Sequence, residues 1–257
     1  MGRTASPGRS LARALWRPLA LVLLCALSLQ LYFVARVALM LLVDPQSTTF
    51  QRSEAWRLLS EKRQITWSQQ WVDGERIGAN LKRAVIASED AGFAEHSGVE
   101  WDAIEKAWDK NLRSEAQAAR RAARAPNSAA AKRPPKVIGG STITQQLAKN
   151  LFLSGERTLP RKAQEFVLTL ALETLLSKQR ILEIYLNNVE WGEGLFGAQA
   201  AARHYFRTDA QRLDTYAAAR LAVMLPAPKR FEKNPGSGYV QGRAATIVAR
   251  MPAVELP

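Results

Sequence analysis

Cysteine and histidine are almost absent from this 257-residue sequence. Cys25 is the only cysteine, so the chain cannot form an internal disulfide. The two histidines, His96 and His204, lie far apart in the sequence and have no cysteine beside them, which excludes a zinc site of the common Cys/His type. We interpret His96 as a hydrogen-bonding residue in a turn and assign no metal-binding residue.

Acidic residues are missing from residues 1–43, which contain five arginines and so carry a charge of +5. Residues 109–136 contain eight Lys or Arg against two acidic residues, a charge of +6. These two segments supply most of the net charge of +13, so the rest of the chain is close to neutral. The high net charge therefore does not indicate a nucleic-acid partner.

One long apolar run covers residues 19–43, which exceeds the ~20 residues needed to cross a bilayer. Gln30 and Arg36 interrupt it, and Arg36 is near enough to its end to reach the far interface. A signal peptide is the alternative, but the run is longer than the apolar part of a usual one. Four arginines lie in residues 1–18, which predicts a cytoplasmic tail, a single-pass anchor and a domain on the outer side.

No segment has a strand pattern as strong as the helical ones. Residues 44–79 are polar with scattered tryptophans, and we interpret them as a connector or a jaw segment. Apolar residues then recur at three-to-four spacing, which predicts a mainly α domain over residues 80–257. Residues 109–136 have few large apolar residues, and we expect a mobile basic insertion there that can be helical in part. Helices are predicted over 80–90, 99–108, 142–152, 161–177, 179–188, 197–206 and 214–224.

Glu89 and Asp90 end the first of these helices. Adjacent helical residues point about 100° apart, so at most one of the two faces a given cleft. Val85 and Ile86 can shield Glu89, and burial would raise its pKa toward the range that a general acid or base needs. Two solvated carboxylates at a helix end are the alternative interpretation.

Residues 139–150 predict a glycine-containing turn that runs into a helix. Ser141 or Thr142 can cap this helix, and Thr142 and Gln145 have the spacing of a capping box. Exposed backbone amides at such a helix start favour a phosphate. Capping does not explain the second glutamine, Gln146.

Four cations lie within 14 residues, at Lys149, Arg157, Arg161 and Lys162. Arg161 and Lys162 are four and three residues from Glu165, so an ordinary surface salt bridge is the default interpretation for them. The four cations together provide what a pyrophosphate leaving group requires.

Four stretches over residues 80–232 resemble, in order, the motifs of the peptidoglycan glycosyltransferases, glycosyltransferase family 51. No penicillin-binding segment follows them, so the resemblance is greatest to members with this domain alone. It implies a lysozyme-like helical lobe, a smaller jaw lobe, and a location at the bacterial inner membrane with the catalytic domain in the periplasm. The stretches are Glu89-Asp-x-x-Phe93-x-x-His96-x-Gly98, Gly140-Ser-Thr-Ile-Thr-Gln-Gln146, Arg161-Lys-x-x-Glu165 and Arg180-Ile-Leu-Glu183-x-Tyr-Leu-Asn187-x-x-x-x-Gly192.

The resemblance also implies roles for residues. Glu89 would be the base that deprotonates the 4-hydroxyl of an acceptor lipid II, which attacks C1 of the lipid-linked donor with inversion and releases undecaprenyl pyrophosphate. Asp90 would assist, and Glu165 would contact or position the substrate. No cofactor is required, although Mg²⁺ or Mn²⁺ can neutralise the pyrophosphate. The expected substrate-binding residues are Ser141, Gln145, Gln146, Lys149, Arg157, Arg161 and Lys162.

The expected partners are lipid II, the growing glycan strand, membrane lipids and other cell-wall synthesis or division proteins. The basic insertion either lies over anionic headgroups or the lipid II pyrophosphate, or is solvated and has no role. Two other classes of protein stay open. A lysozyme-like enzyme would cleave the same polymer without needing cations for a pyrophosphate, and a membrane-tethered basic scaffold would not need Glu89.

Overall fold

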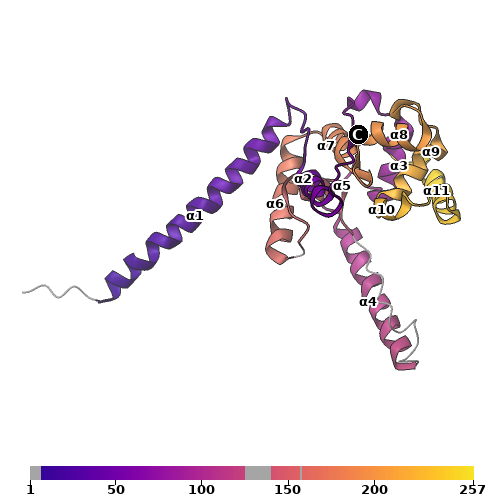
Figure 1. The fold of residues 1–257 in the computed structure, drawn as a ribbon. Coiled ribbons are helices and arrows are strands. Elements are labelled where there is room, and N and C mark those ends of the chain that lie inside the picture. Colours follow the sequence, from indigo (N-terminus) through magenta and orange to yellow (C-terminus); the bar gives the residue numbers. More distant parts are fainter. Residues whose placement is uncertain (1–6, 125–139, 157) are drawn as a thin grey trace, which may run out of the picture. The chain divides into compact units, whose positions relative to one another are not determined.

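The structure, a computed structural model, describes residues 7–124, 140–156 and 158–257 and has two compact units, Met1–Val43 and Asp44–Pro257. In the first unit, α1 (Pro7–Leu39) is a single helix (Figure 1). Its segment Trp16–Leu39 is long and apolar enough to cross a membrane, by length and composition. Residues 40–42 form a turn, so the apolar run predicted to reach residue 43 continues beyond the helix.

The second unit is mainly helical, as predicted, and six of the seven predicted helices are observed within two residues at each end. Side-chain oxygens explain where four of them begin, because Thr142, Thr158, Ser177 and Asp214 each accept a backbone N–H from the first turn. The six helices are α3 (Ala79–Glu89), α5 (Ile143–Phe152), α6 (Leu159–Leu175), α7 (Lys178–Asn188), α8 (Ala198–Phe206) and α9 (Thr215–Met224).

The seventh helix, α4 (Trp101–Arg124), is much longer than predicted. The apolar pattern predicted an end at Trp108, followed by a mobile insertion that can be helical in part, and residues 109–124 continue the helix without a break. Alanine and arginine are among the best helix formers, so a segment too poor in apolar residues to build a core can still be helical. Residues 125–136 of the predicted insertion lie outside the described residues.

Residues 44–79 belong to the second unit and contain α2 (Thr49–Arg57), the π-helical turn η1 (Leu58–Lys62) and the 3₁₀ turn η2 (Gly74–Arg76). Thr48 caps α2 in a capping box with Gln51. The Thr49 hydroxyl donates a hydrogen bond to the Leu151 carbonyl at 2.9 Å, and α2 packs against α5. This segment is therefore part of the same compact unit as the predicted site.

Three short strands that the sequence did not predict form a small sheet in the order β1-β3-β2. β1 (Ser68–Gln69) is parallel to β3 (Leu195–Phe196), and β2 (Glu190–Gly192) is antiparallel to β3. Strands this short cannot show the alternation on which prediction depends. Gly194 joins β2 to β3 with a φ of +70°, and a Cβ there would lie 1.9 Å from the Thr66 carbonyl oxygen, so no larger residue fits.

Two groups of helices position the site. α3 packs against α9 and α11 (Gly238–Arg250), and α5 packs against α2, α6 and α7. The site lies where the end of α3 meets the start of α5. The division of this unit into a large lobe and a jaw lobe stays a prediction. The remaining short elements are α10 (Pro228–Phe231), η3 (Ala210–Arg212) and η4 (Met251–Ala253).

Candidate functional site

Glu89, the last residue of α3, carries a partly buried carboxylate. Gln146 Nε2 donates a hydrogen bond to Glu89 Oε2 at 3.0 Å, and the Ser88 hydroxyl is 3.4 Å from the other oxygen. Burial raises the pKa of Glu89 above its ordinary value, although these two hydrogen bonds oppose the rise. The direction agrees with the sequence prediction, and Val85 and Ile86 are fully buried as expected.

Tyr185, to which the sequence analysis assigned no role in the site, fixes the orientation of Gln146. Its hydroxyl donates a hydrogen bond to Gln146 Oε1 at 3.0 Å, so the amide nitrogen of Gln146 faces Glu89. Burial, together with the charges of Glu89 and Asp90, raises the pKa of Tyr185 well above its usual range. The phenol therefore stays protonated and remains a donor.

Asp90 is buried and joins the first motif to the second. Its Oδ2 accepts the Ile143 N–H at 2.9 Å, and its Oδ1 lies 2.7 Å from His96 Nε2. Because His96 Nδ1 accepts the Gly98 N–H at 3.0 Å, the ring proton is on Nε2 and is donated to Asp90. These contacts give Asp90 a positioning role, and its predicted assistance in catalysis stays a prediction. The interpretation of His96 as a hydrogen-bonding residue is confirmed.

The start of α5 is closed by groups of the protein itself. Thr142 accepts the Gln145 N–H and Gln145 Oε1 accepts the Thr142 N–H, which confirms the predicted capping box. With Asp90 on the Ile143 amide, the anion at this helix start is a carboxylate, so the prediction of a phosphate on these amides is wrong. Gln145 is buried in the cap, whereas Ser141 is exposed.

Gly98, the last residue of the first motif, packs closely against α6. Its φ is +86°, and a Cβ would lie 2.7 Å from the side chains of both Thr169 and Glu173. The Thr142 hydroxyl donates a hydrogen bond to the Gly98 carbonyl at 2.7 Å. The glycine of the first motif is thus required by backbone conformation and by packing.

Glu165 on α6 is almost fully buried, contrary to the surface salt bridge that was the default interpretation. Arg161 Nη1 donates to Glu165 Oε2 at 3.0 Å, and Lys162 pairs with the other oxygen. Paired with both cations, the buried Glu165 side chain orders Arg161 and Lys162.

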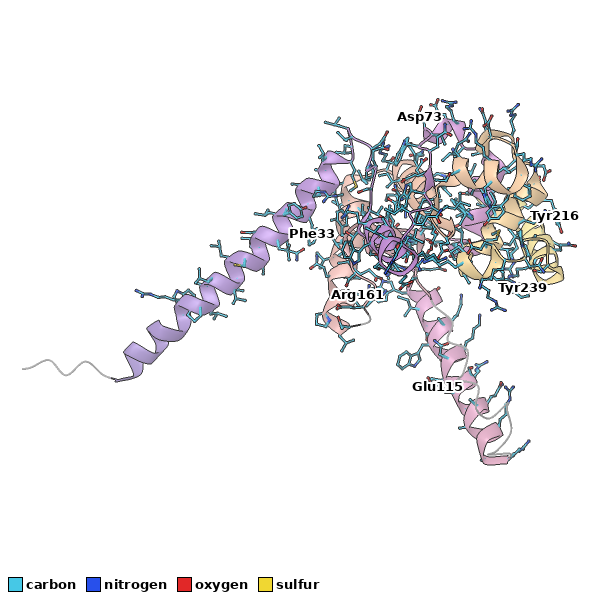
Figure 2. All side chains as sticks on the ribbon, viewed as in Figure 1. Phe33, Asp73, Glu115, Arg161, Tyr216 and Tyr239 are labelled. Atoms are coloured by element: carbon cyan, nitrogen blue, oxygen red, sulfur yellow. The ribbon has the colours of Figure 1, made fainter. Side chains whose placement is uncertain are left out.

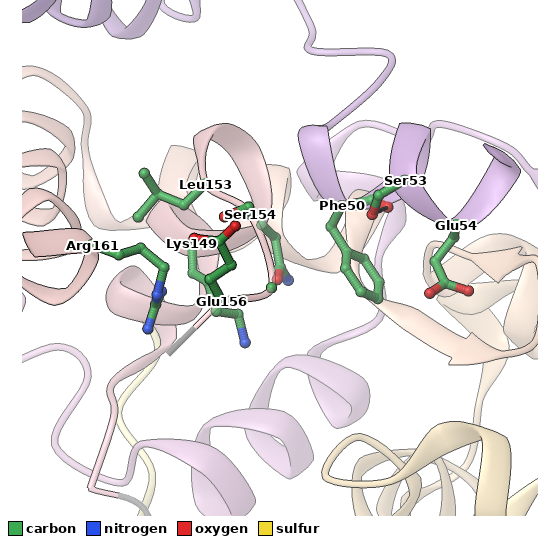
Figure 3. Close-up of a pocket in the computed structure, with 10 residues that line it drawn as sticks. Phe50, Ser53, Glu54, Lys149, Leu153, Ser154, Glu156 and Arg161 are labelled. Carbon is green, nitrogen blue, oxygen red and sulfur yellow. Dashed lines mark hydrogen bonds between the residues drawn. The ribbon is translucent and has the colours of Figure 1, made fainter. Parts of the chain in front are cut away.

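A cavity of about 310 Å³ brings together two of the four predicted cations, Lys149 and Arg161. Figure 3 shows these two on one side of the cavity and Phe50 and Glu54, both from α2, toward the other. Arg161 Nε is buried and has no hydrogen-bond partner among the described residues. Arg157 lies outside the described residues, and Lys162 faces Glu165 and does not line the cavity.

The sequence did not predict the ionic cluster that Glu54, a residue of the cavity wall, forms with Arg57 and Lys229. Glu54 Oε2 accepts hydrogen bonds from Lys229 at 2.5 Å and from Arg57 at 3.0 Å. Burial alone would raise the pKa of Glu54, but these hydrogen bonds outweigh it and lower the pKa. Glu190 lies 3.6 Å from Lys229, too far for a hydrogen bond, and burial raises its pKa to about 7. The capping box at Thr48 could have located α2, but no sequence signal pairs α2 with α10.

Among the described residues, the carboxyl and imidazole groups of Asp90, His96 and Glu100 are close enough to surround a cation. Two of the three do not fit this role, because Asp90 and His96 are hydrogen-bonded to each other and to backbone amides. A divalent ion at the site would therefore rely on oxygens that a substrate brings.

Comparisons with known proteins give one consistent result. The sequence model of the transglycosylase family matches residues 57–252. The chain is 51% identical over 231 residues to the biosynthetic peptidoglycan transglycosylase of Burkholderia thailandensis, covering 90% of this chain and 83% of that protein. It is 46% identical over 239 residues to the protein of the same name from Paraburkholderia phytofirmans, covering 93% and 91%.

Proposed function

The chain belongs to the transglycosylase family, and from this membership we propose that it is a peptidoglycan glycosyltransferase that polymerises lipid II into glycan strands. The observation that carries the chemistry is the partly buried carboxylate of Glu89, whose pKa is raised. Its hydrogen-bond partner, the Gln146 amide, is held in orientation by the Tyr185 hydroxyl. A carboxylate in this setting is a stronger base than one in water. Among the residues that the structure describes, Glu89 Oε1 has only the Ser88 hydroxyl, 3.4 Å away, as a hydrogen-bond partner, so this oxygen is available to a substrate hydroxyl.

In the proposed reaction, Glu89 takes the proton of the acceptor 4-hydroxyl as its oxygen attacks C1 of the donor. The bond between C1 and the pyrophosphate oxygen breaks, and the leaving group takes the bonding electron pair. Attack from the face opposite the leaving group inverts C1 and gives the β-1,4 linkage. Glu89 then returns its proton to solvent.

The departing diphosphate is proposed to bind in the cavity that Lys149 and Arg161 line. Preorganised cations at the position where negative charge develops stabilise the transition state without the cost of reorganising water. Glu165 supports this role because its charge holds Arg161 in place. Ser141, Gln146, Arg157 and Lys162 complete the proposed substrate-binding set, and Mg²⁺ or Mn²⁺ would assist only by binding the diphosphate.

The membrane arrangement is also part of the proposal. The apolar segment of α1 would anchor the protein in the bacterial inner membrane, and the arginines before it would keep the N-terminus in the cytoplasm. Residues 44–257 would then face the periplasm, where lipid II, the growing strand and other cell-wall synthesis proteins are its partners.

A lysozyme-like cleaving enzyme is less well supported. Glycosidic hydrolysis generally uses two carboxyl groups, one on each side of the scissile bond. Asp90, the nearest candidate by sequence, has a side chain with no solvent exposure, and its two oxygens accept hydrogen bonds from Ile143 and His96. Hydrolysis of finished glycan also has no use for the cations of the cavity.

Polymerisation of labelled lipid II by purified full-length protein tests the proposal. Glu89→Gln should lose activity by about 10³-fold or more, and Lys149→Ala by about 10²-fold. Glu95→Gln and Lys233→Ala are the matched controls, because both side chains are exposed and neither contacts the site. Full activity of Glu89→Gln would remove the proposed base, and shortening of finished glycan strands would favour the cleaving enzyme.

A further inference from the structure

Glu54, on α2, places a carboxylate in the wall of the cavity that would receive a diphosphate. Figure 3 shows it toward one side of the cavity and Lys149 and Arg161 on the other; Arg161, in the first turn of α6, is also labelled in Figure 2. A carboxylate in this place repels an anionic ligand unless cations neutralise it. Arg57 and Lys229 supply these cations, since both donate hydrogen bonds to Glu54 Oε2, at 3.0 Å and 2.5 Å.

Lys229, on α10, lies between two acids. Its Nζ is 2.5 Å from Glu54 Oε2 and 3.6 Å from Glu190 Oε1, so only Glu54 receives a hydrogen bond. Glu190, on β2, is 6% exposed, and its Oε1 is buried and has no hydrogen-bond partner among the residues that the structure describes. Burial raises the pKa of Glu190 to about 7, so near neutral pH this side chain changes between an uncharged acid and an anion.

The charged groups with the largest effect on Glu190, among the described residues, are one cation and two acids. Besides burial, Glu54 from α2 and Glu232, which follows α10, raise the pKa of Glu190, whereas Lys229 lowers it. The side chain of Lys229 is partly exposed, so its ammonium can move the short distance between the two carboxylates that it adjoins. The ion pairs of Arg57 are with other acids, namely Glu54, Glu61 and Glu193.

We propose that Glu190 is a positioning residue for the diphosphate of the donor, and that it acts through Lys229 and Glu54; this inference rests on the proposed function. While Glu190 is uncharged, Lys229 stays on Glu54 and neutralises the carboxylate in the cavity wall. When Glu190 is ionised, it adds a negative charge to the cluster and competes for Lys229, which leaves Glu54 less neutralised. The cavity wall then repels the diphosphate more strongly.

The direction of the effect follows from the titration of Glu190. A diphosphate that is esterified at both ends keeps its charge near neutral pH, so the change comes from the protein. The donor should bind more tightly below the pKa of Glu190, about 7, and more weakly above it. The alternative is that the cluster only joins α2 to α10 and β2, in which case pH changes the stability of the fold and not the affinity for the donor.

The test measures the Kd of lipid II for the detergent-solubilised full chain at about pH 6 and about pH 8, in a Glu89→Gln background. This background prevents turnover and removes the titration of the proposed base. The affinity should be about fivefold weaker at the higher pH. Glu190→Gln should abolish this difference and keep the tighter affinity at both pH values. Glu95→Gln is the matched control, since Glu95 is exposed and does not contact the site, and it should keep the full difference.

A second set of variants tests the path through Lys229. Lys229→Met leaves Glu54 with Arg57 alone and should weaken binding about fivefold even at the lower pH. Adding Glu54→Gln removes the carboxylate charge and should restore the affinity, whereas loss of a merely structural contact would not be restored in this way. Lys229→Arg keeps the cation and should bind as the unsubstituted chain does.

Denaturant unfolding of the same variants separates the two roles of the cluster. If Glu190→Gln removes a pH dependence of stability but leaves the pH dependence of the lipid II Kd unchanged, the role is structural and the proposal is overturned. Failure of Glu54→Gln to restore binding in the Lys229→Met chain would also overturn it. A chain with no lipid II polymerisation before any substitution would remove the proposed function, and this inference with it.

Discussion

Tyr185→Phe tests whether Tyr185, acting through Gln146, lowers the pKa of Glu89. The substitution removes one hydroxyl, and with it the hydrogen bond that orients the Gln146 amide. Gln146 can then turn its oxygen toward Glu89 and withdraw the donor that stabilises the charged carboxylate. A hydrogen bond to a charged group contributes about 1.5–3 kcal/mol, which corresponds to a change of roughly one to two pKa units.

Because Tyr185 acts through Gln146, we expect the lower end of that range, a rise of about one unit in the pKa of Glu89. A base works in its deprotonated form, so the acid limb of kcat/KM against pH should move to higher pH by the same amount. At pH values well above that limb, the rate should remain within a few-fold of wild type. Initial rates of lipid II polymerisation between about pH 5 and 9 measure this shift.

Tyr205→Phe is the matched control, since it removes a hydroxyl that donates to the Trp191 carbonyl at 2.8 Å and does not contact Gln146. It should leave the acid limb where it is. Gln146→Ala removes the donor altogether and should move the limb at least as far as Tyr185→Phe. An unshifted limb in Tyr185→Phe, or equal shifts in the two tyrosine variants, would refute the reasoning.

Three further substitutions test the framework of the site by denaturant unfolding of the detergent-solubilised protein. Asp90→Ala leaves the first amide of α5 and the ring of His96 without their acceptor, and should lower the free energy of unfolding by about 2–3 kcal/mol. Glu190 has a pKa raised from 4.5 to about 7, so the folded protein holds a proton that the unfolded chain releases, and stability should fall as pH rises through this interval. Glu190→Gln should remove up to about 3 kcal/mol of that fall, and identical pH profiles for variant and wild type would contradict the assignment. Gly98→Ala forces a methyl group to within 2.7 Å of α6 side chains and should cost about 2 kcal/mol or more, whereas Gly242→Ala, with open space around it, should not destabilise.

The helices were predictable where two local signals agreed. α5 has both apolar spacing and a Thr142 capping box, and its observed start is one residue from the predicted one. α2 has a capping box but a mostly polar sequence, so its pattern is too weak to find without the α5 surface that it covers. The full length of α4 does not follow from the apolar pattern, because residues 109–124 have too few large apolar residues to form a core, while helix propensity alone is sufficient there.

For the site, the sequence identified the groups but not their pairings. Glu89 and Gln146 were chosen independently, and the structure joins them by a hydrogen bond across 57 residues. Asp90 was assigned an assisting role by resemblance to the family's first motif, and the structure shows that its hydrogen-bond partners are a backbone amide on α5 and His96. Such pairings depend on which helix start lies next to which helix end. That contact belongs to the tertiary structure and leaves no signal in the local sequence.

The hydrogen bond between Thr142 and the Gly98 carbonyl closes a 44-residue excursion of the chain at its base. α4 lies within this excursion, so a change in the length of α4 need not displace Glu89 or Gln146. Doubling the length of a flexible loop adds only about 0.6 kcal/mol of closure entropy. We therefore expect a change in the length of this excursion to leave the hydrogen bond between Glu89 and Gln146 in place.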